Sequence, residues 1–185
     1  MPQPKFTQSQ FIDFFLNFLQ YIQPQQQDAD LITSEIKMLY GPSQTNLNLL
    51  LSRLMNSGTD QPVVEAGLVL FFRILSVYGL NSLTQFNCHR LITSSLILAN
   101  ITFEDDTLLL TRWQRMTNYA WSLPEMRYMV IEMLASIRFK LIVEQEEINH
   151  LWQLVLLPFY NHSLLQSDIE QFISEQRELV LEIKD

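Results

Sequence analysis

The sequence predicts an all-α fold. Apolar residues recur at helical spacing along most of the chain, and no stretch alternates convincingly with the period of two expected of a strand. Glycine is rare, with 4 in 185 residues, whereas sheet proteins need glycine- or asparagine-rich turns at most strand ends. A chain of this length with 48% apolar residues can bury the core of one ordinary domain.

Residues 1–41 are predicted to form an N-terminal helical extension and a linker. Large apolar residues spaced three and four apart predict a helix from Thr7 to Gln23, which Pro24 ends. Six residues form its apolar face: Phe11, Phe14, Phe15, Phe18, Leu19 and Ile22. We expect this face to pack on the rest of the protein, because exposing it would leave a large apolar patch. A short second helix is predicted from Asp30 to Leu39.

Five further helices are predicted between residues 42 and 143. They span these ranges: Thr45 to Met55, Asp60 to Tyr78, Asn87 to Ile101, Leu108 to Asn118, and Ser122 to about Phe139. The third is apolar nearly all round, which predicts that other helices surround it. Ser122 followed by Glu125 forms a capping box at the start of the fifth, with Pro124 in its first turn.

Residues 144–185 are predicted to form two C-terminal helices that pack on this bundle. They span Glu144 to Leu156 and Leu164 to Ile183, and Pro158 separates them. The alternative is that the first or the last helix of the chain contacts a partner or a second copy. The sequence leaves the oligomeric state open.

Three ordered motifs within residues 42–143 resemble parts of a known domain. Asn87–Thr93 reads Asn-Cys-His-Arg-Leu-Ile-Thr and is similar to the opening of that domain's third helix. Leu98–Asp105 is similar to the end of the same helix, and Ser122–Leu141 to the fifth helix. The stretch resembles a cyclin box, in particular that of the single-box cyclins of the PHO type and of cyclin Y. The resemblance implies a five-helix bundle with additional N- and C-terminal helices.

The same resemblance implies a function and a binding surface. The function is that of a regulatory or binding subunit of a protein kinase of the cyclin-dependent type, without catalysis of its own. The third and fifth box helices would dock a helix of the kinase. Eight residues are the expected partner-binding set: Ile97, Ile101, Phe103, Glu104, Met126, Arg127, Val130 and Met133.

Two positions depart from the cyclin pattern. The family has a Lys and a Glu that contact the kinase, and they correspond to Ile101 and Val130 here. Losing both members of a polar pair can be neutral for folding, whereas losing one leaves a buried charge at a cost of about 3–5 kcal/mol. The fold is therefore expected to persist, while recognition of a conventional kinase changes. The alternative function is an adaptor that no longer activates a kinase and binds another protein or itself.

The fifth helix carries a broad methionine-rich apolar stripe. Its members are Met126, Met129, Val130, Met133, Leu134 and Ile137. Methionine suits an adaptable binding surface, because its side chain is unbranched and polarisable. It also fills irregular gaps in a core, and the spacing alone favours that interpretation.

The sequence offers no constellation for catalysis, and we expect no cofactor and no metal site. The three histidines are scattered, and Cys88 and His89 are adjacent, so on a helix they point about 100° apart. The acidic run Glu104-Asp105-Asp106 is more typical of a solvated turn than of a cation site. A small α-helical enzyme is the weakest of the three function classes.

Charge and composition also exclude classes of partner. Net charge is −8, which repels nucleic acid and anionic membrane. The one basic and aromatic cluster, Arg112 with Trp113 and Arg115, fits a tryptophan buried in the bundle better than a platform for bases. The longest apolar runs are shorter than the roughly 20 residues that span a bilayer. With a single cysteine and no secretory signal, we expect a cytoplasmic or nuclear protein.

Overall fold

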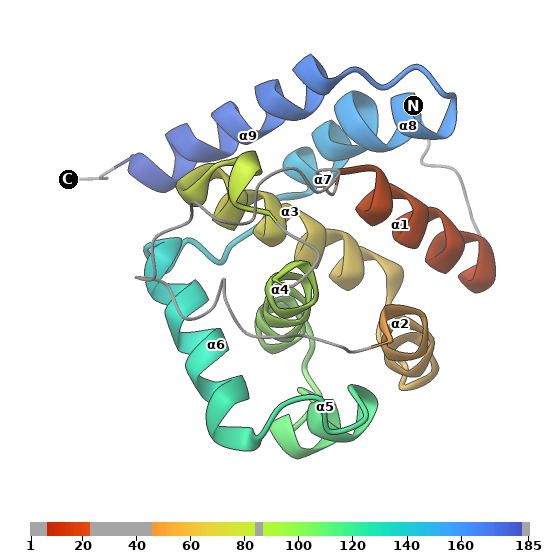
Figure 1. Ribbon diagram of the computed structural model, residues 1–185, viewed down its shortest axis with the longest axis vertical. Coiled ribbons are helices and arrows are strands. Elements are labelled where there is room, and N and C mark those ends of the chain that lie inside the picture. The colour runs from red at the N-terminus through yellow and green to blue at the C-terminus, as the bar shows by residue number, and fades with distance from the viewer. Residues whose placement is uncertain (1–6, 23–45, 84–86, 183–185) are drawn as a thin grey trace.

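Helix α4, Cys88–Phe103, lies at the centre of the fold (Figure 1). The structure is a computed structural model that describes residues 7–22, 46–83 and 87–182. Every regular element within those ranges is helical, which confirms the predicted all-α class. Figure 1 views α4 end-on, and the helices drawn around it include α2 (Leu47–Asn56), α3 (Gln61–Tyr78), α5 (Leu110–Met116) and α6 (Leu123–Ser136).

Helix α4 is buried along nearly its whole length because α3 and α6 both pack along it. Helix α3 is also buried along most of its length, and its ends follow the predicted signals. Asp60 precedes its first turn, Pro62 lies within that turn, and Gly79 ends it with a φ of 84°. These two helices supply the largest part of the core.

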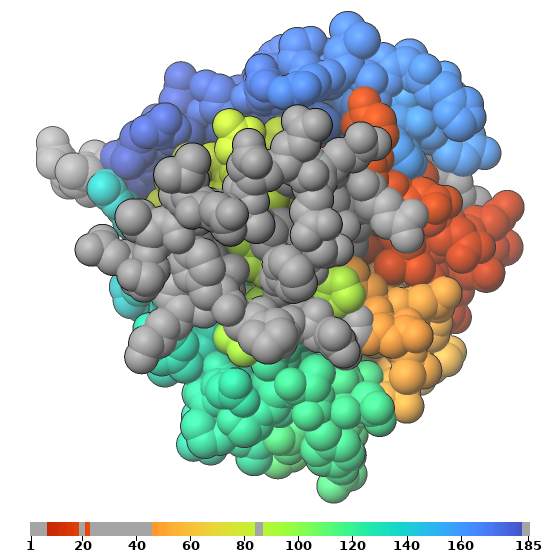
Figure 2. Space-filling model, viewed as in Figure 1, coloured from red at the N-terminus to blue at the C-terminus, as the bar shows by residue number. Residues whose placement is uncertain are grey.

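Helix α1, Gln8–Ile22, packs across one edge of this bundle. Five residues of its predicted apolar face are buried: Phe11, Phe14, Phe15, Phe18 and Ile22. In Figure 2, α1 (red) lies between α2 (orange) and the C-terminal helices (blue). The predicted helix from Asp30 to Leu39 lies outside the described residues.

The first C-terminal segment is one continuous helical stretch, contrary to the prediction that Pro158 separates two helices. It comprises α7 (Gln145–Leu151), a wider π-helical turn η4 (Trp152–Leu156) and α8 (Leu157–Tyr160). Pro158 lies at the start of α8, directly after the π-helical turn, and the helical stretch continues through it. The helix ends instead beyond Tyr160, where His162 adopts a φ of 55°.

The last helix, α9 (Gln166–Leu181), packs along α3, as does α7. Aromatic side chains join α1 to this C-terminal part. The Phe14 ring stacks on Trp152 with centroids 6.1 Å apart, and Phe18 meets Phe159 edge-on at 5.4 Å. The N- and C-terminal helices thus cover α3 on the side away from α4 (Figure 1).

Helices α5 and α6 are shorter than predicted. Helix α6 ends at Ser136 rather than near Phe139, because Arg138 and Phe139 adopt left-handed φ angles of 52° and 60°. The Phe139 N–H then bonds back to the Leu134 carbonyl at 3.0 Å, which closes the end of the helix. Helix α5 ends in the same way before Asn118 and Tyr119.

Helix α3 is the one helix among the described residues that is long and apolar enough to cross a membrane. It has 18 residues with a mean hydropathy of 1.4, and 78% of that stretch is buried inside the fold. Core helices of soluble proteins meet the same criterion, so its length and composition are weak evidence for a membrane span.

Candidate functional site

The start of α6 is fixed by the predicted capping box. The Glu125 carboxylate accepts hydrogen bonds from Ser122 N at 2.8 Å and from Ser122 Oγ at 2.7 Å. The Glu125 N–H donates to Ser122 Oγ at 3.4 Å. These bonds, with a smaller contribution from the nearby Arg90 charge, hold the pKa of Glu125 below its ordinary value.

Arg90 ties this capped end of α6 to the first turn of α4. Its Nη2 lies 3.5 Å from Glu125 Oε1, and its guanidinium carbon lies 5.9 Å from the centre of the Trp121 ring. Arg90 is only 8% exposed, so the Glu125 carboxylate and the Trp121 ring compensate its charge where little solvent reaches it. The side of α4 that carries Arg90 is therefore the side that faces α6.

Two residues expected to bind a partner continue along that side of α4. Ile97 and Ile101 follow Arg90 by 7 and 11 residues, close to two and three full helical turns. Ile97 is fully buried against the bundle, whereas Ile101, in the last turn, is 47% exposed. Only Ile101 is accessible to a partner.

The methionine stripe of α6 faces the core. Met126, Met129 and Met133 are each completely buried. Ile97, Met126 and Met133, which are expected to bind a partner, are thus buried in the structure rather than exposed on its surface. They contribute to the packing of the core.

The side of α6 opposite Glu125 presents a different surface. Val130 lies 140° around the helix from Glu125, with the buried methionines between them. Ile101 lies in the last turn of α4, on the side that faces α6. On α6, Arg127 and Ile131 are exposed, Ile131 to 64%, and Val130 and Leu134 are half-buried. We call this group the α4–α6 surface: Ile101, Arg127, Val130, Ile131 and Leu134.

Phe103 and Glu104 do not belong to the α4–α6 surface. Phe103 is 40% exposed but follows Leu96 by seven residues, and so lies on the side of α4 that faces α3. The Glu104 carboxylate accepts a hydrogen bond from Asp60 N at 3.3 Å, next to the start of α3. Both residues therefore lie on another side of the bundle from Ile101, and their expected binding roles stay a prediction.

Ile131 and Leu134 are members of the surface that the expected binding set omits. Ile131 follows Arg127 by four residues, and Leu134 follows Val130 by four. Neighbours at this spacing share a helix face. That signal is present in the sequence, but the apolar stripe of α6 is too broad to show where its buried part ends.

The described residues contain no group of three or more His, Cys, Asp or Glu side chains that could hold a metal ion. Glu65 is 1% exposed and accepts a hydrogen bond from Gln61 at 2.7 Å, deep in the bundle. Burial raises its pKa, and hydrogen bonds from Gln61 and Trp152 oppose the rise. A carboxyl enclosed in this way has no access to a substrate.

Trp113 is completely buried, as the interpretation of a tryptophan within the bundle requires. Its ring cannot stack on a nucleic-acid base from there. Cys88 is also fully buried, so its thiol is not available as a nucleophile at the surface.

Comparisons with known proteins return no match: no protein-family model, no curated protein and no solved structure matches this chain. The interpretation of the α4–α6 surface depends on the geometry of the chain itself.

Proposed function

We propose that this chain is a cyclin-like binding subunit that docks a helix of a protein kinase of the cyclin-dependent type. The docking site is the α4–α6 surface, and the chain contributes no catalysis of its own. The packing of α3 and α6 along a buried α4 supports the proposal, because the resemblance implies a helical bundle and assigns docking to these two helices, α4 and α6. The sequence motifs of that resemblance lie on α4 and α6.

The observation that carries the proposal is the exposure of isoleucine on both helices of one surface. Ile101 ends α4 and Ile131 stands on α6, with 47% and 64% of their surfaces exposed. Full burial of an isoleucine side chain contributes about 1.5–3 kcal/mol. An apolar partner helix lying along the α4–α6 surface would bury both isoleucines, and each would contribute part of that free energy to binding.

The terminal helices that the structure describes leave this surface open. Helices α7 and α9 pack on α3, and α1 packs on α2. Contact with a partner at α4 and α6 therefore does not require these helices to move.

A second candidate is an adaptor that binds a protein other than a kinase. Ile101 and Val130 favour it, because they replace the Lys and Glu that contact the kinase in the family that the chain resembles. An apolar helix is a better match for this surface than one that offers charged partners.

The two candidates are separated by affinity purification from the native cell, with the partners identified by mass spectrometry. Wild type, Ile101→Glu and Ile131→Glu are compared with Leu181→Glu, a matched change at a residue of α9 that is 48% exposed. The first candidate requires that wild type captures a kinase of the cyclin-dependent type. The amount captured should fall tenfold or more in both surface variants and stay unchanged in the control.

A partner of another class with the same pattern of loss supports the adaptor. The double variant Ile101→Lys with Val130→Glu distinguishes the candidates further. If it binds a kinase that wild type does not bind, the adaptor is favoured. If folded wild type captures nothing that the two surface variants lose, both candidates are wrong.

A further inference from the structure

The side of α6 that points away from the core is mostly apolar, although the solvent side of a surface helix usually carries its polar residues. The buried Met126, Met129 and Met133 mark the side that faces the core. Tyr128 is 50% and Ile131 64% exposed, so two large side chains are available to a partner on the other side. Five exposed residues lie within about 60° of the direction opposite the methionines, and we call them the outer face of α6: Pro124, Arg127, Tyr128, Ile131 and Ala135.

Arg127 carries the single charge of the outer face. The two carboxylates of α6, Glu125 and Glu132, lie about 100–120° around the helix from Ile131. None of the three ion pairs formed by described residues includes Arg127. An exposed guanidinium beside apolar side chains is thus available to a carboxylate of a partner.

The charge around Arg127 is positive, in a chain that is negative overall. Residues 107–143, which include α5 and α6, contain five basic and two acidic residues, whereas the whole chain has a net charge of −8. Arg112 and Arg115 of α5 are exposed, as is Arg138 beyond the end of α6. Helices α5 and α6 pack on each other and form one end of the molecule, green to teal in Figure 2. This end attracts an acidic partner, while the rest of the chain repels it.

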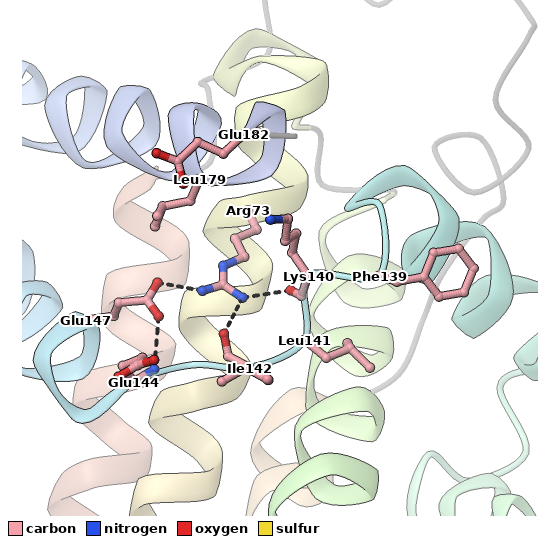
Figure 3. A pocket seen from close by; sticks show the side chains of 9 residues that line it. All are labelled: Arg73, Phe139, Lys140, Leu141, Ile142, Glu144, Glu147, Leu179 and Glu182. Atoms are coloured by element: carbon pink, nitrogen blue, oxygen red, sulfur yellow. Dashed lines mark hydrogen bonds and ion pairs between the residues drawn. The ribbon is translucent and has the colours of Figure 1, made fainter. Parts of the chain in front are cut away.

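Both ends of α6 are held by contacts within the chain. The capping box fixes its start. Beyond its end, Arg73 donates to the carbonyls of Lys140 at 2.7 Å and Ile142 at 2.9 Å, and pairs with Glu147 (Figure 3). The outer face is therefore preorganised, and a partner that binds it loses little free energy to the ordering of α6.

We propose that the outer face of α6 docks an amphipathic helix of a partner protein, in which an acidic residue beside the apolar stripe pairs with Arg127. The apolar stripe of the partner covers Tyr128 and Ile131, and the small side chain of Ala135 allows the two helices to approach closely. The inference rests on the proposed function for the position of the docking site. It adds the charge of the partner and the side of α6 that the partner covers.

Two other occupants fit this face less well. A second copy offers α9, which carries four acidic residues, but the apolar side of α9 is buried within its own chain at Ile169, Phe172 and Val180. Nucleic acid would leave Ile131 without an apolar partner, and the net charge of −8 repels it.

The test selects binders from a displayed library of helical peptides of about 16 residues, with the full chain as the target. We expect wild type to retain peptides that have an apolar stripe at three- and four-residue spacing with Asp or Glu beside it. Ile131→Glu should weaken their binding about tenfold or more. Arg127→Glu should weaken it about fivefold or more, because repulsion replaces the ion pair. Arg177→Glu, the same change at an exposed residue of α9, is the control and should leave binding unchanged.

Each variant changes an exposed residue, and circular dichroism checks that it stays folded. A lysine in place of the acidic residue of a selected peptide should restore its binding to the Arg127→Glu variant. Peptides that depend on Ile131 but bind wild type and Arg127→Glu equally would overturn the inference and leave the docking surface of the proposed function in place. Retention of no helical peptide, or of peptides that Ile131→Glu still binds, would count against both.

Two further measurements cover the other occupants. Sedimentation equilibrium shows whether wild type forms a dimer that Ile131→Glu abolishes. A single-stranded DNA oligonucleotide shows whether wild type binds nucleic acid in a way that Arg127→Glu abolishes. Either result would overturn the inference, and neither is expected.

Discussion

Gly67 of α3 lies directly against Leu96 of α4. A Cβ atom added at Gly67 would come within 2.8 Å of Leu96 Cδ2 and 3.3 Å of Leu96 Cα. Leu96 is 1% exposed, so its side chain has little room to withdraw. The absence of a side chain at Gly67 thus allows the two core helices to approach each other at this point, although glycine is a poor residue for a helix interior.

Gly67→Ala is expected to destabilise the protein by about 1–2 kcal/mol. Overpacking a core costs about 1–3 kcal/mol, and the better helix propensity of alanine recovers up to about 1 kcal/mol. Urea unfolding measures the net change. In a Leu96→Ala background the same substitution should cost less or become favourable, because the opposing side chain is gone. An equal loss in both backgrounds would place the strain elsewhere.

Local signals along the chain predicted much of this fold. The helical periods predicted the described helices, and the capping box of Ser122 and Glu125 set the start of α6. Helix ends and connections that depend on contacts between residues far apart in the sequence were predicted less well. The chain beyond α6 is held by Arg73, which lies 67 and 69 residues before the carbonyls it binds. No local pattern contains such a contact.

The binding surface was predicted only in part, for a related reason. The period of α6 shows that Met126, Val130 and Met133 share an apolar stripe, but not which of them the neighbouring helix covers. Burial in the folded protein decides that: Met126 and Met133 are completely buried, whereas Val130 is half-buried at the edge. Proline is ambiguous in the same way, since Pro158 can end a helix or lie within a continuous helical stretch, as it does here.

Phe18→Ala is expected to lower the free energy of unfolding by about 3–5 kcal/mol, the usual cost of truncating a buried phenylalanine. Phe18 is completely buried, with ring centroids 6.0 Å from Phe72 and 5.4 Å from Phe159. Thermal or urea unfolding measures the loss. Asn17→Ala, at the exposed neighbouring position, is the control and should change stability by less than about 0.5 kcal/mol. Similar results for the two variants would mean that α1 does not hold the bundle together.

Glu65→Gln is expected to stabilise the protein at pH 7. Burial raises the pKa of Glu65 in the folded state above its ordinary value of 4.5, so the folded protein binds this proton more tightly than the unfolded chain. Stability is therefore lost as pH rises from 4.5 through the folded pKa. Glutamine keeps an acceptor for Gln61 and removes the charge.

The measurement is the free energy of unfolding of wild type and Glu65→Gln as a function of pH. The two curves should coincide below pH 4.5 and separate above it, with the variant more stable. The exposed Glu178→Gln should follow wild type throughout. A Glu65→Gln variant that is less stable than wild type at pH 7 would show that the carboxylate is better solvated than its burial indicates.

Replacing Arg73 or Glu147 alone is expected to cost about 3–5 kcal/mol, because each change leaves the other charge unpaired in the protein interior. Replacing both members of a buried pair with apolar residues is often neutral. Here it should not be, because Arg73 also binds the carbonyls of Lys140 and Ile142. Each carbonyl left without a partner costs about 1–3 kcal/mol if it stays buried.

Urea unfolding of Arg73→Met, Glu147→Met and the double variant tests this argument. The double variant should recover part of the loss of the single variants and remain less stable than wild type. Gln176→Met removes a third Arg73 contact without removing a charge, and it should cost less than either single change at the ion pair. A double variant as stable as wild type would show that the connection from α6 to α7 keeps its course without Arg73.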